Sequence, residues 1–182
     1  MKFCSSCGHP VEQRVPAGDN RPRYVCPSCE TIHYQNPRIV AGTVPVWEGQ
    51  ILLCRRAIEP RYGYWTLPAG FMENSETTEE AATRETLEEA EATVSLEGLY
   101  TIIHVPHIDQ VHMFYRAQLI DGRYGAGEES LETQLFNPAD IPWERISFPT
   151  VRRTLEHFIE DLPRQEYPMR ISDIRYKLKP GA

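Results

Sequence analysis

Three glutamates, Glu85, Glu88 and Glu89, are spaced at i, i+3 and i+4 in a stretch whose composition favours a helix. On a helix this spacing puts their carboxylates on one face, where like charges repel. No lysine or arginine stands between them. A hard divalent cation such as Mg²⁺ or Mn²⁺ would relieve the repulsion, because these ions take carboxylate oxygens and keep water positions open. The spacing therefore predicts a divalent-cation site that could bind a diphosphate and activate water.

The negative charge of the chain is concentrated around these glutamates. The 182 residues carry 19 basic and 26 acidic side chains, for a net charge of −7. Residues 73–97 contain nine Glu, one Arg and no Lys or Asp, whereas the rest of the chain has a net charge of +1. A solvated acidic helix face is the alternative interpretation, because most charge runs are of that kind. The regular spacing of the three glutamates favours the metal site.

Four cysteines near the N-terminus have the spacing of a zinc site. Cys4 with Cys7 and Cys26 with Cys29 form two C-x2-C pairs that are separated by 18 residues. Two tight turns of this kind can complete a tetrahedral shell of sulfur ligands. Two disulfides are the alternative, but the opening MKFCSSCGHP lacks a secretory apolar segment, and Cys54 would be left over. Four sulfur ligands leave no open position, so we expect a structural zinc ion.

The segment from residue 70 to residue 92 resembles the Nudix box, G-x5-E-x7-R-E-U-x-E-E-x-G-U, in which U is a bulky aliphatic residue. Six residues fall on the fixed positions of this motif: Gly70, Glu76, Arg84, Glu85, Glu88 and Glu89. The resemblance covers about residues 37–160. It implies a Nudix-type α/β/α sandwich with a mixed β-sheet, and an enzyme that hydrolyses a nucleoside diphosphate linked to another moiety.

The resemblance also implies a role for each motif residue. Glu85, Glu88 and Glu89 would bind Mg²⁺ or Mn²⁺ and so act in catalysis, and the Gly70 carbonyl could join them as a further ligand. The remaining two motif residues would form a structural pair that holds the loop and helix in shape: Glu76 and Arg84.

Three positions depart from the motif. Thr86 and Ala92 stand where aliphatic residues are expected, and Glu91 replaces the terminal glycine. Glycine at that position would favour a helix C-cap, and glutamate does not. We therefore expect the helix to continue past Glu91.

Attack of water on phosphorus needs a positioned base or a metal-bound hydroxide. In Nudix enzymes the base often lies on a loop outside the box. The acidic residues of the loop at 125–132 are the candidates here, with Glu129 first, Glu132 second and Glu128 also available. A solvent-exposed acidic loop without a catalytic role is the alternative.

Several arginines and aromatic residues near the box could contact the substrate. A planar guanidinium suits a diphosphate because it can bind two oxygens at once. We expect one of three arginines to face the substrate: Arg55, Arg56 or Arg61. Phe71 could stack on a nucleobase or flavin, although such aromatic residues are more often part of the core. Three histidines lie around a predicted hairpin and are interpreted as loop or pocket residues: His104, His107 and His112.

A Nudix domain preceded by a zinc ribbon resembles two groups of enzymes. The NADH pyrophosphatases carry an S-Q-P-W-P-F-P-x-S stretch after the box, and nothing in this chain matches it. Residues 135–143 and 147–149 are instead similar to enzymes of plants and bacteria that split FAD or ADP-ribose. The resemblance therefore implies hydrolysis of ADP-ribose or FAD with release of AMP, with NADH or NAD as the alternative substrate.

The rest of the chain supplies the elements that position these residues. Strands are predicted at 39–47, 51–56, 65–67, 99–105, 111–120 and 133–136, and residues 68–70 are predicted to open a loop. Helices are predicted at 77–92 and 151–161. This mixture indicates an α/β domain with helices on a mixed sheet. We expect a zinc ribbon at 1–36, a Nudix hydrolase domain at 37–160 and a C-terminal arm at 161–182.

The composition also restricts the partners. No apolar run approaches the ~18 residues that indicate a transmembrane helix, and an acidic balance argues against broad nucleic-acid binding. We expect a cytoplasmic protein that binds a small molecule and no membrane, and a homodimer, because interfaces often recruit small modules such as the ribbon. The competing hypothesis is a sensor whose ribbon binds nucleic acid or protein, supported by its basic residues: Lys2, Arg14, Arg21 and Arg23.

Overall fold

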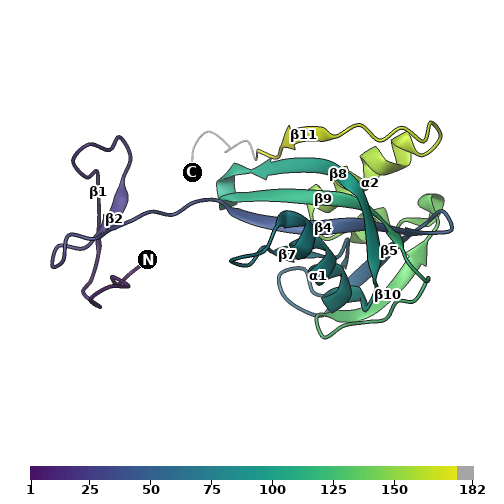
Figure 1. The fold of residues 1–182 in the computed structure, drawn as a ribbon, viewed down its shortest axis with the longest axis horizontal. Helices are drawn as coiled ribbons and strands as arrows, with labels where there is room; N and C mark the ends of the chain where they lie inside the picture. The colour runs from purple at the N-terminus through teal and green to yellow at the C-terminus, as the bar shows by residue number, and fades with distance from the viewer. Residues whose placement is uncertain (176–182) are drawn as a thin grey trace. The chain divides into compact units, whose positions relative to one another are not determined.

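The computed structural model describes residues 1–175 and divides the chain into two compact units, which meet in the sequence between Pro37 and Arg38 (Figure 1). The last part of the predicted C-terminal arm, residues 176–182, lies outside the described residues. No helix in the described part of the chain is long and apolar enough to cross a membrane.

The first unit is a small three-stranded antiparallel sheet in which the strands lie in the order β1-β2-β3. Its strands are β1 (Glu12–Arg14), β2 (Arg23–Val25) and β3 (Ile32–His33). Each cysteine pair lies in a tight turn. The Gly8 N–H donates to the Cys4 carbonyl at 2.9 Å, and the Glu30 N–H donates to the Cys26 carbonyl at 3.0 Å.

The second unit contains a mixed sheet in the order β10-β5-β4-β9-β8-β11, with β6 paired to β5 and β7 paired to β4. Neighbouring strands are parallel at β4–β9 and β8–β11 and antiparallel elsewhere. The strands are β4 (Arg38–Trp47), β5 (Gln50–Arg56), β6 (Trp65–Thr66), β7 (Ala69–Phe71), β8 (Val94–Val105), β9 (Gln110–Leu119), β10 (Ser130–Phe136) and β11 (Arg170–Asp173).

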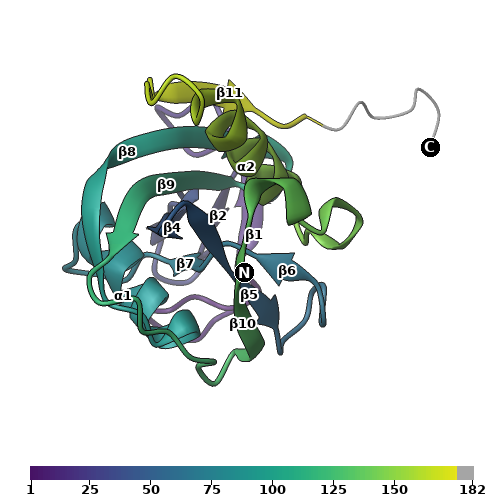
Figure 2. The same ribbon diagram turned by 90° about the vertical axis from the view of Figure 1, so that its right-hand side faces the viewer.

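Two helices, α1 (Thr78–Ala90) and α2 (Pro149–Asp161), cover opposite faces of this sheet (Figure 2). Helix α1 packs against Ala41 and Tyr115, whereas α2 belongs to the cluster that contains Val44 and Phe114. Side chains alternate between the faces of a strand, so these two sets of residues point in opposite directions. The predicted α/β/α sandwich with a mixed sheet is confirmed.

Strands β4 and β5 pair with each other only beside their turn, through Val46–Ile51 and Trp47–Gln50. Further along, β4 pairs with β7 and β5 pairs with β6. The prediction that residues 68–70 are loop was therefore wrong for its second half, because the backbone of β7 pairs with β4. At this place α1 reaches the sheet, since the Ala69 N–H donates to the Glu89 carboxylate at 3.1 Å.

Helix α1 begins at a capping box formed by Thr77 and Glu80, in which each residue's side chain accepts a hydrogen bond from the other's backbone N–H. The prediction that the helix continues past Glu91 was wrong. Glu91 is the C-cap and has a φ of +46°, in the left-handed region. A later loop binds the end of the helix. The Gly125 N–H donates to the Ala90 carbonyl, and the Gly127 N–H donates to the Glu89 carbonyl.

The C-terminal arm is docked on the second unit through β11, which pairs in parallel with β8. A buried hydrogen-bonded group holds it there. Asp161 is 1% exposed and accepts from the Tyr100 hydroxyl at 2.7 Å and from the Arg170 guanidinium at 2.5 Å. Asp161 therefore joins the end of α2, the core of the sheet and the arm.

Candidate functional site

A cavity of about 950 Å³ in the second unit brings together residues from α1, β5, β7, the loop before β10 and the start of α2. Most of the residues predicted to act on substrate or metal line it: Arg56, Gly70, Phe71, Glu85, Glu88, Glu89, Glu128 and Glu129. Three other candidates are not among its lining residues: Arg55, Arg61 and Glu132.

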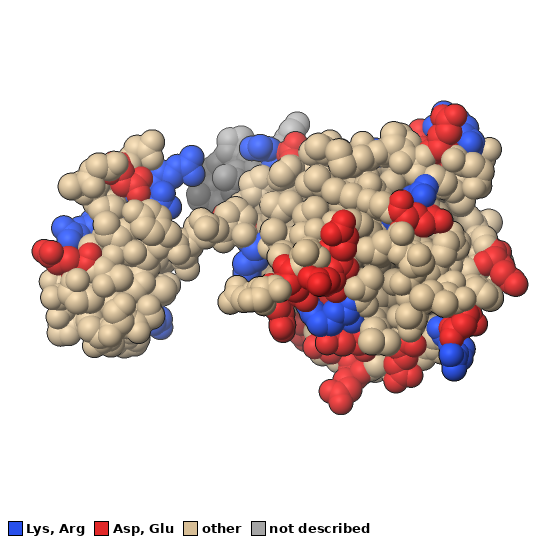
Figure 3. Space-filling view, viewed as in Figure 1, with Lys and Arg blue, Asp and Glu red and all other residues tan. Residues whose placement is uncertain are grey.

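One arginine contacts three carboxylates beside this cavity. The Arg84 guanidinium binds both oxygens of Glu76, at 2.8 and 3.1 Å, and its Nη1 donates to Glu85 at 2.7 Å and to Glu88 at 2.9 Å. Hydrogen bonds from Arg84 hold the pKa of Glu76 at about 2. Although no basic residue lies between the glutamates in the sequence, Arg84 precedes Glu88 by one helical turn and partly offsets the repulsion between Glu85 and Glu88. Figure 3 shows acidic side chains gathered around a basic one over α1.

Two of the three glutamates, Glu85 and Glu89, are largely buried. Glu89 is 7% exposed. Burial, together with the charges of Glu85 and Glu129, raises the pKa of Glu89 to about 8, against the Ala69 N–H and the Arg56 charge, which lower it. Burial also raises the pKa of Glu85. Carboxylates in such surroundings gain from a nearby cation, so the donor set fits a hard divalent ion.

The loop that carries Glu128 and Glu129 is held against the C-terminal end of α1. Besides the two backbone hydrogen bonds to the helix, Gly127 approaches it so closely that an added Cβ would lie 1.7 Å from the Glu88 carbonyl oxygen. Only glycine fits there without moving either backbone. The contact places Glu128 and Glu129 in the same cavity as the trio.

Substituting Gly127 with alanine is expected to destabilise the protein by about 1–3 kcal/mol, because the added methyl group must displace the loop or the helix end. The displaced loop should also lower hydrolytic activity. Thermal unfolding and initial rates test this expectation, with Ala126→Ser, an exposed position of the same loop, as the control. Unchanged stability in Gly127→Ala would show that the loop can move away without cost.

Arg56 is the one of the three predicted arginines that reaches the cavity. Its Nε donates to the Pro60 carbonyl at 2.9 Å, and its guanidinium lies 5.1 Å from the centre of the Phe148 ring. Arg55 points the other way and pairs with Glu132 at 2.7 Å. Adjacent residues of a strand face opposite sides, so only one of the two could line this cavity.

His112 and Gln110 also line the cavity, although no specific role was predicted for either residue. Their side chains are joined by a hydrogen bond of 2.9 Å between His112 Nε2 and Gln110 Oε1. Burial lowers the pKa of His112 to about 4, so the ring is neutral at pH 7. The available signal was weak, because the predicted strand began at residue 111 and so placed His112 on the strand and Gln110 in the connection before it.

The lowered pKa of His112 predicts a pH dependence of stability. The unfolded state, with a histidine pKa of about 6.5, binds more protons than the folded state between about pH 4 and 6.5. The stabilisation is therefore fully present above pH 6.5 and is lost as the pH falls to 4, by on the order of 1–3 kcal/mol. Denaturant unfolding of His112→Phe should show a smaller loss over this range than the native chain. An equal loss in both would contradict the assignment.

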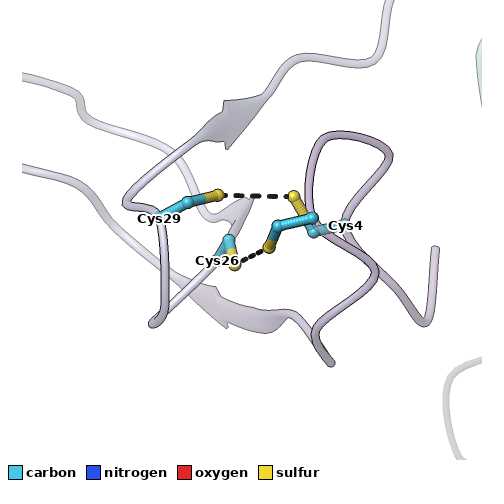
Figure 4. Close-up of side chains that lie close together, drawn as sticks. Cys4, Cys26 and Cys29 are labelled. Atoms are coloured by element: carbon cyan, nitrogen blue, oxygen red, sulfur yellow. Dashed lines mark hydrogen bonds between the residues drawn. The ribbon is translucent and has the colours of Figure 1, made fainter.

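The four N-terminal cysteines form a compact group of sulfur atoms in the first unit (Figure 4). Their sulfurs lie within 4.8 Å of one another, with Cys4–Cys29 at 3.6 Å and Cys7–Cys26 at 3.5 Å. All are free thiols, and so is Cys54. A tetrahedral zinc ion with Zn–S distances of about 2.3 Å requires sulfurs roughly 3.8 Å apart, so the four residues fit that metal.

A histidine and a backbone amide support one of these sulfurs. His33 Nε2 lies 3.3 Å from Cys4 Sγ, and the Ser6 N–H donates to the same atom. Burial opposes ionisation of Cys4, but these contacts and those with Cys7 and Cys29 lower its pKa to about 5. His33 therefore supports a thiolate ligand at Cys4.

Two family models match the chain. One, described as Nudix N-terminal and named for a zinc ribbon, matches residues 2–35, and one described as NUDIX domain matches residues 36–158. A NUDIX hydrolase crystal structure from Nitrosomonas europaea is 49% identical, with a TM-score of 0.92, and the alignment covers 96% of this chain and 99% of that one.

Two curated relatives carry names that mention a substrate. The ADP-ribose pyrophosphatase of Methanocaldococcus jannaschii is 28% identical over 60% of this chain and 67% of its own length. The NAD-capped RNA hydrolase NudC of Edwardsiella ictaluri is 30% identical over 88% of this chain. The match spans 59% of that relative's own length.

Proposed function

This chain belongs to the Nudix family and is a Nudix hydrolase with an N-terminal zinc ribbon, and from this premise we propose that it hydrolyses the diphosphate bond of ADP-ribose or a related dinucleotide in the presence of Mg²⁺ or Mn²⁺. The observation that carries the proposal is the cavity in which Glu85, Glu88 and Glu89 meet Arg56. Names of relatives support both an ADP-ribose-type and an NAD-type substrate. FAD is a further substrate that the sequence resemblance implies.

The glutamate trio, with the Gly70 carbonyl, would hold the divalent ions. When bound, Mg²⁺ neutralises diphosphate charge and lowers the pKa of a water molecule. Glu85 and Glu88 share Arg84 Nη1 as a hydrogen-bond donor. A bound cation would replace it as the positive charge that offsets these two carboxylates. Arg84 would keep its two hydrogen bonds to Glu76, so the loop before α1 stays attached to the helix.

Glu129 is the proposed base, and Glu128 is the alternative because both line the cavity. Glu132 is a weaker choice than the sequence suggested, since it pairs with Arg55. In the reaction, water oxygen bonds to one phosphorus, the bridging P–O bond breaks, and the water proton passes to the carboxylate. The Arg56 guanidinium would bind the phosphate oxygens as negative charge develops there.

A substrate screen tests this function. The protein is incubated with ADP-ribose, FAD, NADH and a diadenosine polyphosphate, with and without Mg²⁺, and the nucleotide products are separated by chromatography. We expect Mg²⁺-dependent release of AMP from at least one of them. Release from none would count against the proposal, whereas tight, salt-sensitive RNA binding without turnover would favour the sensor hypothesis. The homodimer and the cytoplasmic location stay predictions from the sequence.

A further inference from the structure

One part of the cavity is lined by an uncharged row of side chains. Val40 of β4 is the register partner of Phe71 in β7 and of His112 in β9. Register partners on paired strands point to the same face, so these three side chains lie side by side across the sheet. All three line the cavity. The row begins beside the glutamate trio, because Phe71 follows Gly70, where an added Cβ would lie 2.3 Å from the Glu85 carboxylate.

Apolar residues surround the far end of this row. Val105 is the register partner of Gln110, and Phe114 lies two residues after His112 on the same face of β9. Two further apolar lining residues come from the β8–β9 connection and from the C-terminal arm: Ile108 and Ile174. This end of the cavity therefore suits a group without charge.

Phe71, which lies at the end of the row beside the glutamates, has one face of its ring covered by an arginine. The Arg38 guanidinium lies 4.5 Å from the centre of the Phe71 ring, and Phe71 is still 46% exposed. A flat aromatic group stacked on the other face would gain contact area and would meet a ring already fixed from behind.

The His112–Gln110 pair supplies polar recognition in this apolar surrounding. Since His112 Nε2 donates to Gln110 Oε1, the unused atoms are His112 Nδ1, an acceptor, and Gln110 Nε2, a donor. Neither atom has a hydrogen-bond partner within residues 1–175, and neither is sealed from solvent. The pair, whose two residues line the cavity, thus has one acceptor and one donor that no described residue binds.

We propose that the row and the His112–Gln110 pair bind the uncharged planar heterocycle of the substrate. His112 Nδ1 would accept from an amino group of the heterocycle, and Gln110 Nε2 would donate to a ring nitrogen or a carbonyl oxygen. An adenine offers its 6-amino group and N1 for these hydrogen bonds, and the carboxamide of a nicotinamide offers its amino group and its carbonyl oxygen. The inference rests on the proposed function to the extent that the neighbouring carboxylates are taken to bind the diphosphate.

Two pairs of substrates that differ by one hydrogen-bonding group test the proposal. ADP-ribose is compared with its analogue that lacks the purine 6-amino group, and NADH with its analogue that carries an acetyl group in place of the carboxamide. The native chain is expected to prefer the amino-bearing member of at least one pair by about tenfold or more in kcat/KM, through KM. A lost hydrogen bond that leaves a polar partner unsatisfied costs about that factor.

Two substitutions should abolish this preference, and the loss should appear mainly in KM: His112→Phe and Gln110→Met. His104→Phe is the matched control, because His104 is exposed on the neighbouring strand and does not line the cavity. Thermal unfolding of each variant shows whether it is folded, and either variant alone can decide the outcome. A native chain that does not discriminate in either pair, or variants that keep the preference, would overturn the proposal.

A separate binding measurement distinguishes this inference from the proposed function. Calorimetric titration of the same four compounds in Ca²⁺, which takes the same oxygen ligands in a looser geometry, measures affinity without needing turnover. If no compound is hydrolysed in Mg²⁺ but binding distinguishes the members of a pair and depends on His112, the proposed function fails and the proposed heterocycle-binding site stands. If hydrolysis occurs but neither rate nor binding distinguishes the members of a pair, the proposed heterocycle-binding site fails and the proposed function stands.

Discussion

Exchanging Glu88 for glutamine is expected to lower Mg²⁺-dependent hydrolysis by at least about a hundredfold, which corresponds to roughly 2.7 kcal/mol of transition-state stabilisation. The Glu88 side chain lines the cavity and is 59% exposed, so the amide should fit without harm to the fold. The amide removes a charged ligand from the proposed cation site. It also leaves Arg84 bound to Glu76 and Glu85, so the shape of the loop is retained.

The control for this variant is Glu79→Gln, an exposed residue in the first turn of the same helix. It changes the net charge by the same amount outside the cavity, so it should keep its activity. Rates at increasing Mg²⁺ separate weaker metal binding from slower chemistry, because only the former is restored at high concentration. A Glu88→Gln enzyme as active as the control would contradict the assignment of Glu88 as a ligand of the divalent cation.

Loss of the zinc ligands is expected to have the largest effect on structure. Structural zinc contributes about 10–16 kcal/mol of apparent binding free energy in small metal-dependent domains. A unit of fewer than about 40 residues rarely folds without such a contribution. Cys26 is fully buried in the ribbon, and Cys26→Ser should therefore abolish zinc binding and unfold residues 1–37, while the second unit keeps its own melting transition.

Metal analysis and hydrogen exchange measure these two effects. The native chain should contain one zinc ion per chain and should protect the Cys26 and Glu30 amides, whose N–H groups donate within the second cysteine turn. The control is Cys54→Ala, a buried free thiol of the second unit, which should leave the zinc content unchanged. A Cys26→Ser chain that retains protection in the ribbon would show that it folds without metal.

Motif spacing and local pattern predicted much of this molecule, because they depend on neighbouring residues. The glutamates at i, i+3 and i+4 fall on one helical face wherever that helix is placed. In the same way, the paired C-x2-C turns of the ribbon require only their own backbone. The α/β/α sandwich followed from such patterns and from the resemblance.

Features that depend on distant segments could not be predicted in this way. The end of α1 at Glu91 is set by Gly125 and Gly127, which come more than 30 residues later. Nothing near Glu91 indicates that a loop will bind the last carbonyls. The choice between Arg55 and Arg56 was open for a similar reason, since alternation shows that they face opposite sides without showing which side holds the cavity.

The proposed binding role of the His112–Gln110 pair could not be predicted from the sequence for the same reason. Each residue alone is an ordinary polar side chain on a strand, and the pair gains its meaning from the row that Val40 and Phe71 complete. Val40, Phe71 and His112 are separated by 31 to 72 positions in the chain. Their meeting depends on β4 lying between β7 and β9, which is a property of the sheet order.

Hydrolysis of ADP-ribose in water enriched in ¹⁸O, in the presence of Mg²⁺, tests the central claim most directly. Water attack on a diphosphate bond predicts AMP and ribose 5-phosphate in equal amounts, with a single ¹⁸O atom in one of the two phosphates. The same result is predicted for FAD or NADH if either is preferred, with AMP as the shared product. A folded, zinc-loaded protein that releases no AMP from any of these compounds above the rate without protein would contradict the account.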